Sequence, residues 1–303
     1  MKYLHENKEL FDNLIIRTSQ YNGITTDIIR KDYFVYCLLK EIANNIPNIV
    51  FKGGTSLSKC FNLIDRYSED IDLNFIHEEK MTDSKLQQFN RSLVSIIQNS
   101  GFTINNIDDL KSRRKSNTFM SEFKQDEQKI TEIKVETSLG IPAYPITRKL
   151  VASYIYDFLN NQNRQDLIKE YNLEPFEINA QNIERTFIDK VFALCDYYER
   201  PEPGRNSRHI YDLYKLYPKI KINNEFNNLI KQVRTERQNY ARKVNISAQD
   251  GYNVKQTLQK IIDTEFYKSD FKQVTSLLLY KPIDYDEIIT VLNKIISDPN
   301  FKI

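Results

Sequence analysis

A pair of glycines between a short apolar run and the start of a helix constrains the fold of this chain more than any other feature. The run 48–51 (Asn-Ile-Val-Phe) is rich in β-forming residues and is followed closely by Gly-Gly-Thr-Ser at 53–56. Apolar periodicity then predicts a helix from residue 56 to about residue 64. The next segment, 68–76, alternates polar with apolar residues, as a half-buried strand does. The sequence therefore predicts a strand, a tight turn, a short helix and a second strand in succession.

Asp70 and Asp72 lie two positions apart on the second of these strands. Residues two apart on a strand point to the same face, roughly 6.5 Å from each other, so the two carboxylates project together. Ile71 and Leu73 then face the core. Such a carboxylate pair can share a divalent cation, and Mg²⁺ prefers hard oxygen ligands while leaving positions open for substrate phosphates. We expect Asp70 and Asp72 to hold Mg²⁺, with Mn²⁺ as the alternative ion.

The glycine turn offers a place for those phosphates. Glycine permits backbone conformations and close approaches that a side chain would block, and hydroxyl groups at a helix N-terminus attract an anion. Each part alone is weak evidence, because Asp-x-Asp is common on strand edges and a Gly-Gly pair usually marks only a turn. Their combined order favours a nucleotide-and-metal site. The residues expected to bind the nucleotide here are Gly53, Gly54, Thr55 and Ser56.

The remaining pattern divides the chain into an α/β part and a helical part. Helical periodicity over 6–19, 27–44 and 83–99, and period-two alternation over 116–123 and 129–139, predict helices and a β-hairpin that completes the sheet. From Thr147 onward the pattern is almost only helical, interrupted at Pro175 and at 201–204. Because Gly140, Pro142 and Pro145 break the pattern, we place domains at 1–142 and 143–303.

Composition limits the class of protein. The 303 residues are 40% hydrophobic and 28% charged, which indicates a globular chain, and the net charge of +2 gives no overall signature of nucleic-acid binding. The three cysteines are far apart, which is neither a disulfide framework nor a zinc pattern. The N-terminal residues mix charges into the apolar pattern, and no apolar run is long enough to span a membrane. We expect a cytoplasmic protein, of a size for two domains, and leave the oligomeric state open.

A third acid lies on the second strand of the predicted hairpin. Glu132, Lys134 and Glu136 share one face of this strand because they are two residues apart. Glu136 is the best candidate for a further metal ligand, or for the base that accepts a proton from an attacking hydroxyl. A solvated strand face of alternating charge explains the pattern equally well.

These motifs resemble those of the AbiEii/AbiGii nucleotidyltransferase toxin family, which includes the mycobacterial MenT enzymes and belongs to the polymerase-beta-type superfamily. The resemblance rests on two segments, Phe51 to Lys59 and Arg66 to Leu73, and covers the rest of the chain more loosely. It implies a polymerase-beta-like nucleotidyltransferase domain with a small mixed sheet. A C-terminal helical domain would follow and contribute to the active-site cleft.

The resemblance also implies a role for Lys190. This lysine lies in an amphipathic helix, where it would neighbour Phe187, Val191 and Leu194 rather than open solvent. In the resembling family a lysine at this place faces the nucleotide triphosphate, so Lys190 is a candidate catalytic and nucleotide-binding residue. The alternative is a surface lysine whose aliphatic stem covers the apolar face.

Arg208 and Asp212 are spaced i and i+4, which places them on one face of a helix. They resemble the arginine–aspartate motif of the family, whose aspartate lies in the active-site cleft. We therefore count Arg208 among the nucleotide-binding candidates, and Asp212 among the catalytic ones as the residue that orients Lys190 or the nucleotide. The alternative is a simple intrahelical ion pair.

Two basic clusters are candidates for contact with RNA. The segment 111–115 contains Arg113 and Arg114, and a helix predicted over 223–245 carries a second cluster mostly on one face, with Tyr240 as a ring for stacking. The basic residues of the second cluster are Lys231, Arg234, Arg237, Arg242 and Lys243. A charged run is usually only a solvated face, so this assignment depends on the family resemblance.

The resemblance implies a nucleotidyltransferase toxin of a bacterial toxin–antitoxin system of the abortive-infection type. Such an enzyme would transfer a nucleoside monophosphate from an NTP to RNA, in particular to a tRNA 3′ end, and a cognate antitoxin would neutralise it. Two alternatives remain open. The acceptor could instead be a small molecule or a protein side chain, or the chain could be a non-catalytic interaction protein with the same fold.

Overall fold

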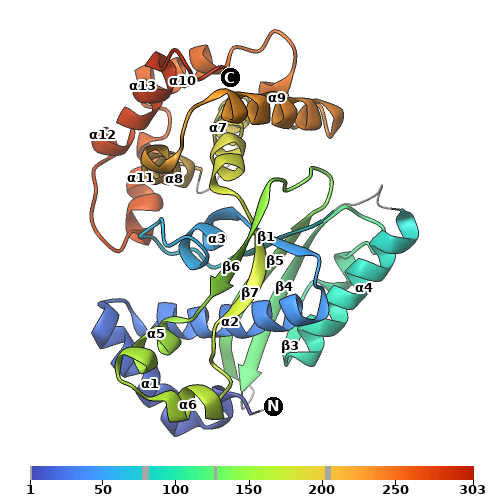
Figure 1. Ribbon diagram of the computed structural model, residues 1–303, viewed down its shortest axis with the longest axis vertical. Helices are drawn as coiled ribbons and strands as arrows, with labels where there is room; N and C mark the ends of the chain where they lie inside the picture. The colour runs from blue at the N-terminus through green and yellow to red at the C-terminus, as the bar shows by residue number, and fades with distance from the viewer. Residues whose placement is uncertain (1, 77–81, 126–127, 202–205) are drawn as a thin grey trace. The chain divides into compact units, whose positions relative to one another are not determined.

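The computed structural model describes residues 2–76, 82–125, 128–201 and 206–303 (Figure 1). The chain forms two compact units, each assembled from three stretches of sequence. The first unit comprises Met1–Phe61, Glu69–Leu139 and Ile146–Ala180, and the second comprises Asn62–Ser68, Gly140–Pro145 and Gln181–Ile303. The two units therefore interleave along the chain. The division into domains 1–142 and 143–303 stays a prediction.

The first unit is built on a seven-stranded mixed sheet with the order β3-β4-β5-β2-β1-β7-β6. Its strands are β1 (Ile49–Lys52), β2 (Ile71–Phe75), β3 (Phe102–Ile104), β4 (Ser116–Gln125), β5 (Gln128–Ser138), β6 (Ile146–Val151) and β7 (Phe176–Gln181). Central β2 pairs antiparallel with β1 and parallel with β5, and β4 pairs antiparallel with β5 as the predicted hairpin. The expected α/β fold with a mixed sheet is confirmed. The residues that join the hairpin strands, 126–127, lie outside the described residues.

Two strands occur after residue 145, in a region where the sequence predicts almost only helix. The pattern after Thr147 indicates helices, yet β6 and β7 extend the sheet beyond β1, with β7 parallel to β1. Phe176, Ile178 and Ala180 of β7 alternate inward and are buried. This strand is six residues long, so its local pattern is short, and pairing with β1 decides its conformation. The prediction of helix from residue 147 is therefore wrong at β6, whereas β7 follows the break that the sequence predicts at Pro175.

Within the described residues of the first unit, six α-helices accompany the sheet. They are α1 (Lys8–Asn22), α2 (Thr26–Asn45), α3 (Gly53–Lys59), α4 (Asp83–Asn99), α5 (Tyr154–Asn161) and α6 (Gln165–Glu170). The helices predicted over 6–19, 27–44 and 83–99 are confirmed as α1, α2 and α4. The helix after the glycine turn, α3, starts at Gly53 rather than Ser56 and ends before the predicted Ile64. It follows β1 without an intervening loop, so the glycine turn forms the start of the helix.

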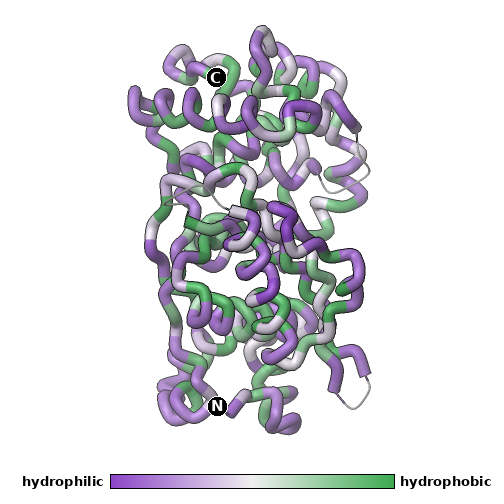
Figure 2. The backbone as a smooth tube through the Cα atoms, turned by 90° about the vertical axis from the view of Figure 1, so that its right-hand side faces the viewer, coloured by the Kyte–Doolittle hydropathy of each residue, from purple (hydrophilic) through white to green (hydrophobic). Residues whose placement is uncertain are grey.

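The second unit is helical in its long C-terminal stretch, as predicted. Its α-helices are α7 (Ile183–Glu199), α8 (Arg208–Leu216), α9 (Asn224–Asn239), α10 (Val254–Asp263), α11 (Lys268–Gln273), α12 (Tyr285–Ile288) and α13 (Thr290–Ser297). Most of the predicted break at 201–204 lies outside the described residues. Hydrophobic residues are interspersed with hydrophilic ones along the chain (Figure 2), and none of the described helices is long and apolar enough to cross a membrane.

An aromatic cluster stabilises the core of the first unit. Phe34 of α2 is 1% exposed, and its ring centroid lies 4.6 Å from that of Phe123 on β4 and 6.2 Å from that of Phe102 on β3. The helix is thereby fixed to the sheet through rings from three elements, and close-packed rings of this kind contribute more than area burial alone.

We expect Phe34→Ala to lower the free energy of unfolding by about 3–5 kcal/mol, because it removes a buried ring and leaves a cavity. Ile16→Ala on α1 is the control, since Ile16 is 50% exposed and its loss should change stability by less than about 0.5 kcal/mol. Urea unfolding followed by circular dichroism measures both. Equal stabilities for the two variants would contradict the assigned core.

Candidate functional site

Strand register places Lys52, Asp72 and Glu136 side by side on three neighbouring strands. Lys52 is the partner of Asp72 across β1 and β2, and Asp72 is the partner of Glu136 across β2 and β5. Neighbouring strands are about 4.8 Å apart, so this row brings one cation and two carboxylates close together. Ile71 and Leu73 on β2 are fully buried, as the alternation predicts. The sequence identified the two acids of the row but missed Lys52.

Asp70 lies one residue before β2, and Lys134 of β5 connects it with Glu136. The Lys134 Nζ atom is 3.7 Å from Asp70 Oδ2 and 3.2 Å from Glu136 Oε1. Partial burial lowers the pKa of Lys134, but the charges of Asp70, Glu136 and Asp72 outweigh that effect and raise it. The sequence placed Lys134 on this face without a role. The structure shows it as a counter-ion that the three acids surround.

The donor set fits Mg²⁺ bound together with substrate phosphates. Within the described ranges, no group of three or more His, Cys, Asp or Glu side chains forms a ready metal cage. Mg²⁺ is usually held by one or two carboxylates, and phosphates and water complete its shell. Asp70 and Asp72 supply those two carboxylates, and the position of Lys134 shows that this cluster attracts positive charge. These residues would therefore hold the ion.

The glycine turn touches the carboxylate of Asp72. Gly53 has φ of +78°, and a Cβ atom added there would lie 1.9 Å from Asp72 Oδ2, so neither its conformation nor its surroundings accept a side chain. Gly54 lies in the first turn of α3. Ser56 is fully buried and donates its hydroxyl to the Gly53 carbonyl at 2.9 Å, while Thr55 is 1% exposed. Ser56 thus stabilises the turn, and phosphate binding by these four residues stays a prediction.

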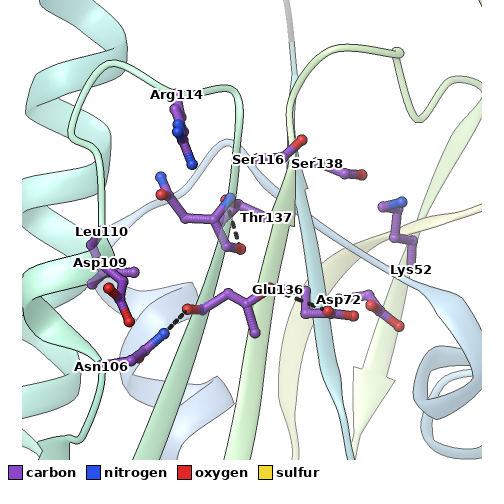
Figure 3. Close-up of a pocket in the computed structure, with 12 residues that line it drawn as sticks. Lys52, Asp72, Asn106, Asp109, Leu110, Arg114, Ser116, Glu136, Thr137 and Ser138 are labelled. Atoms are coloured by element: carbon purple, nitrogen blue, oxygen red, sulfur yellow. Dashed lines mark hydrogen bonds between the residues drawn. The ribbon is translucent and has the colours of Figure 1, made fainter. Parts of the chain in front are cut away.

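A cavity of about 520 Å³ opens beside the row of charged residues (Figure 3). Its lining comes from the ends of β1, β2, β4 and β5 and from the segment before β4: Lys52, Asp72, Asn106, Asp109, Leu110, Arg114, Ser116, Asn117, Thr118, Glu136, Thr137 and Ser138. Figure 3 shows Lys52 on one side of Glu136, and Asp109 and Asn106 on the other. The cavity therefore contains both acids and cations in its lining, with Lys52 and Asp109 on opposite sides of Glu136.

Lys190 and Asp212 meet in a buried ionic cluster of the second unit, which Arg66 completes. Arg66 donates from Nε to Asp212 Oδ1 at 2.7 Å and from Nη2 to Oδ2 at 2.8 Å, and Lys190 Nζ donates to Oδ2 at 2.6 Å. Arg66 is 2% exposed, Lys190 6% and Asp212 0%. The reading of Lys190 as a surface lysine is therefore wrong. No ion pair joins Arg208 to Asp212 in the part of the chain that the structure describes, so the intrahelical pair is wrong as well.

The cluster shifts the pKa of each of its members. Burial opposes the charge of Asp212, but Arg66 and Lys190 outweigh burial and hold its pKa well below the usual range. Burial lowers the pKa of Lys190, and the nearby Arg66 acts in the same direction. Burial also lowers the pKa of His209, whose ring stacks on Tyr197 with centroids 5.8 Å apart. Sequence analysis places Arg66 in a motif but assigns it no role, because its partner Asp212 is 146 residues away.

The basic face predicted over 223–245 does not form. Helix α9 ends at Asn239, so Arg242 and Lys243 follow the helix, although they are exposed. Arg237 Nη2 donates to Asp196 at 2.7 Å, and the guanidinium groups of Arg234 and Arg237 lie 5.4 and 5.3 Å from the ring centre of Phe192. These two arginines therefore hold α9 against α7, and reversing their charge would test packing rather than RNA binding.

The other residues of that cluster are also either exposed or packed within the protein. Lys231 is exposed on α9, so it stays a candidate for RNA contact together with Arg242. The Tyr240 ring packs on Gly140, where a Cβ atom would come within 2.0 Å of it. The Tyr240 ring therefore packs within the second unit. In the first cluster Arg113 and Arg114 are both exposed, and Arg114 lines the cavity described above.

Comparison with known proteins gives two findings. The family model described as "Nucleotidyl transferase AbiEii toxin, Type IV TA system" matches residues 38–291, which contain the row, the glycine turn and the buried cluster. Among solved structures, MenT4, a nucleotidyltransferase toxin of Mycobacterium tuberculosis H37Rv, matches with a TM-score of 0.50 and 16% sequence identity, covering 94% of this chain and 88% of that one. At this identity the similarity concerns the fold. No curated protein matches the sequence.

We expect Gly53→Ala to destabilise the protein more than Gly23→Ala. Both glycines have positive φ, +78° and +66°, so an alanine at either position costs about 1–3 kcal/mol of backbone strain. Only at Gly53 must the added methyl group also displace Asp72, since nothing lies within 4 Å at Gly23. The difference between the two free energies of unfolding isolates the contact. A difference near zero would show that Asp72 does not approach the turn.

We expect the contribution of Asp212 to the free energy of unfolding to depend on pH. Its pKa in the folded protein lies below the ordinary value of 3.8, so its charge stabilises the fold fully above about pH 5 and progressively less as pH falls. We expect Asp212→Asn to cost about 3–5 kcal/mol near pH 6, because two buried cations lose their partner. The difference from the unchanged protein should shrink by up to about 1.4 kcal/mol per pH unit below pH 4. Urea unfolding at pH 6, 4 and 3 measures it.

Asp65→Asn is the matched control for that series. Asp65 is 53% exposed and pairs with Lys215, so its loss should cost less than about 1 kcal/mol at every pH. A pH-independent effect of Asp212→Asn would contradict the charged buried cluster.

Proposed function

The chain belongs to the AbiEii family of nucleotidyl transferase toxins of type IV toxin–antitoxin systems, and on this premise we propose that it transfers a nucleoside monophosphate from an NTP to RNA. The row of Lys52, Asp72 and Glu136 beside the glycine turn carries the proposal, because it combines acids for a metal ion with a cation for phosphates. The acceptor that we propose is a tRNA 3′ end.

Each residue of the row has a separate part in the proposed reaction. Asp70 and Asp72 would hold Mg²⁺ or Mn²⁺, which supplies positive charge to the phosphates during in-line displacement. Lys52 binds the triphosphate from β1, beside the glycine turn. The acceptor hydroxyl attacks the α-phosphorus, the bond to pyrophosphate breaks, and Glu136 accepts the hydroxyl proton. The Thr118 hydroxyl, 3.4 Å from Glu136 Oε1, orients that carboxylate.

Lys190 is a further residue that we propose to bind the triphosphate, and Asp212 orients it. The support is the 2.6 Å bond from Lys190 Nζ to Asp212, which fixes a lysine that retains little exposed surface. Arg66 takes part indirectly, since its two bonds hold the carboxylate in place. A nucleotide contact of Arg208 remains part of the proposal.

The partners follow from the family and from the proposed substrates. A type IV toxin–antitoxin system pairs its toxin with an antitoxin, so a cognate antitoxin is the expected protein partner. Nucleoside triphosphates and tRNA are cytoplasmic, and we therefore propose that the protein acts in the cytoplasm.

We expect the purified protein, incubated with Mg²⁺, total tRNA and each labelled NTP in turn, to transfer label into RNA. Asp72→Asn should lower the rate by about a hundredfold or more, because it removes a charged metal ligand. Asp83→Asn, which changes an exposed aspartate at the start of α4, should leave the rate unchanged. Label in protein or in a small acceptor would replace RNA as the substrate class. No transfer at all, with toxicity intact in Asp72→Asn, would favour the non-catalytic alternative.

Lys190→Ala should impair transfer nearly as severely as Asp70→Ala. The variant leaves Asp212 paired with Arg66, so the buried carboxylate keeps a partner and the unit should still fold. Transfer rates and urea unfolding of both variants give the comparison. A folded Lys190→Ala variant with unchanged transfer would remove Lys190 from the proposed mechanism.

A further inference from the structure

Two buried asparagines fix the loop that precedes β4. Asn90 of α4 donates to the carbonyls of Ser112 at 2.8 Å and of Arg114 at 3.1 Å. Asn117 donates to the Lys111 carbonyl at 3.1 Å and accepts from the Lys111 amide at 3.2 Å, and it also donates to Asn90 Oδ1 at 3.1 Å. Asn90 is 3% exposed and Asn117 is 8% exposed. Buried amides stabilise a structure only when they are hydrogen-bonded, so their bonds here hold the loop backbone in one conformation.

The fixed loop presents Arg114 to the cavity that contains Asp72 and Glu136. A turn closes it, with the Arg114 amide donating to the Lys111 carbonyl at 2.9 Å. Arg114 lines the cavity, whereas the adjacent and equally charged Arg113 does not. The Arg114 guanidinium has no ion-pair partner within the residues that the structure describes. Its charge is therefore available to a ligand in the cavity.

Two hydroxyl groups face the same cavity. Ser116 of β4 and Ser138 of β5 are register partners, two residues from the Thr118–Glu136 pair, so they face the same side as Glu136. Both line the cavity. One guanidinium and two hydroxyls are the donor types that bind a phosphate oxygen or a ribose hydroxyl, and a guanidinium fits phosphate in bidentate geometry.

We propose that the part of the cavity beside β4 is the acceptor subsite, where Arg114 binds a phosphodiester of the acceptor RNA. The inference rests on the proposed function. Asp109 also lines the cavity, and its carboxylate repels a second phosphate but accepts hydrogen bonds from ribose hydroxyls or base amines. The subsite therefore suits one nucleotide with one phosphate, directed so that its terminal hydroxyl reaches Glu136.

The sheet order separates the acceptor end of the cavity from the donor end. The glycine turn and Lys52 belong to β1, and Arg114 directly precedes β4, with β2 and β5 between them. Three strand spacings correspond to about 14 Å, so Lys52 and Arg114 contact different phosphates. Glu136, the proposed base, is on β5 between the two. A triphosphate at the β1 end and an RNA end at the β4 end would thus approach each other across Glu136.

Steady-state transfer with varied tRNA and varied NTP tests this assignment in the full chain with Mg²⁺. Arg114→Ala should raise the KM for tRNA about tenfold, the effect of one lost charge-assisted contact, and change the KM for NTP less than about twofold. Arg114→Lys should recover part of the loss because it keeps the charge. Arg113→Ala should have a several-fold smaller effect. Arg91→Ala, an exposed arginine of α4 outside this cavity, is the inert control.

Salt dependence adds a readout that a structural role would not change. The slope of log affinity for labelled tRNA against log salt concentration should be shallower by about 0.7–0.9 in Arg114→Ala and unchanged in Arg91→Ala. Equal effects of Arg113→Ala and Arg114→Ala would overturn the subsite, since general charge would then explain both. A rise in the KM for NTP alone would assign the cavity end to the donor. If the unchanged protein transfers no label to RNA, the proposed function fails first and the subsite with it.

Discussion

The pairing of β2 with β1 on one side and β5 on the other is the constraint on which the candidate site depends. A slip of one residue in either pairing would turn Asp72 inward and Ile71 or Leu73 outward, because side chains alternate along a strand. Burial of those two apolar residues fixes the register, and the register places Lys52 and Glu136 beside Asp72. The core of the first unit therefore sets the geometry of its charged row, and Gly53 can approach Asp72 closely only because that row is fixed.

In the buried cluster of the second unit, by contrast, burial is unfavourable, because it costs free energy to bury charged groups. Removing an aspartate and two cations from water is unfavourable, and only the geometry of three short bonds between them offsets that cost. A well-packed apolar cluster could stabilise α7 and α8 equally well without a charged group. The presence of Lys190 next to a fixed carboxylate therefore favours a functional role over a purely structural one. Arg66 makes this possible by neutralising Asp212 from a segment that directly precedes Asp70.

The sequence predicted the parts of the structure that have a local signal. The glycine turn, the alternation around Asp72 and the helices α1, α2 and α4 follow from periodicity and from residue types within a few positions. Strand β7 was missed because its conformation depends on pairing with β1, more than a hundred residues earlier, and the Arg66–Asp212 bond spans 146 residues. The loop held by Asn90 and Asn117 has no motif at all. In the sequence Asn90 and Asn117 cannot be told from other polar residues, and only the fold brings their side-chain amides into contact.

The same limit explains why charge alone was a poor guide to binding. A count of basic residues treats Arg113, Arg114, Arg234 and Arg237 alike. The nearly neutral net charge of +2 does not indicate which of them binds a ligand. The fold distinguishes them. Arg237 pairs with Asp196, and both Arg234 and Arg237 pack on the Phe192 ring, while Arg114 lines a cavity that contains acids of the proposed site. A cation whose charge already has a partner stabilises the protein, and one without a partner attracts a ligand. Because the bonds of Asn90 and Asn117 fix the loop backbone, Arg114 is held at the cavity without an ion pair of its own among the described residues, which is the arrangement that a ligand-binding arginine requires.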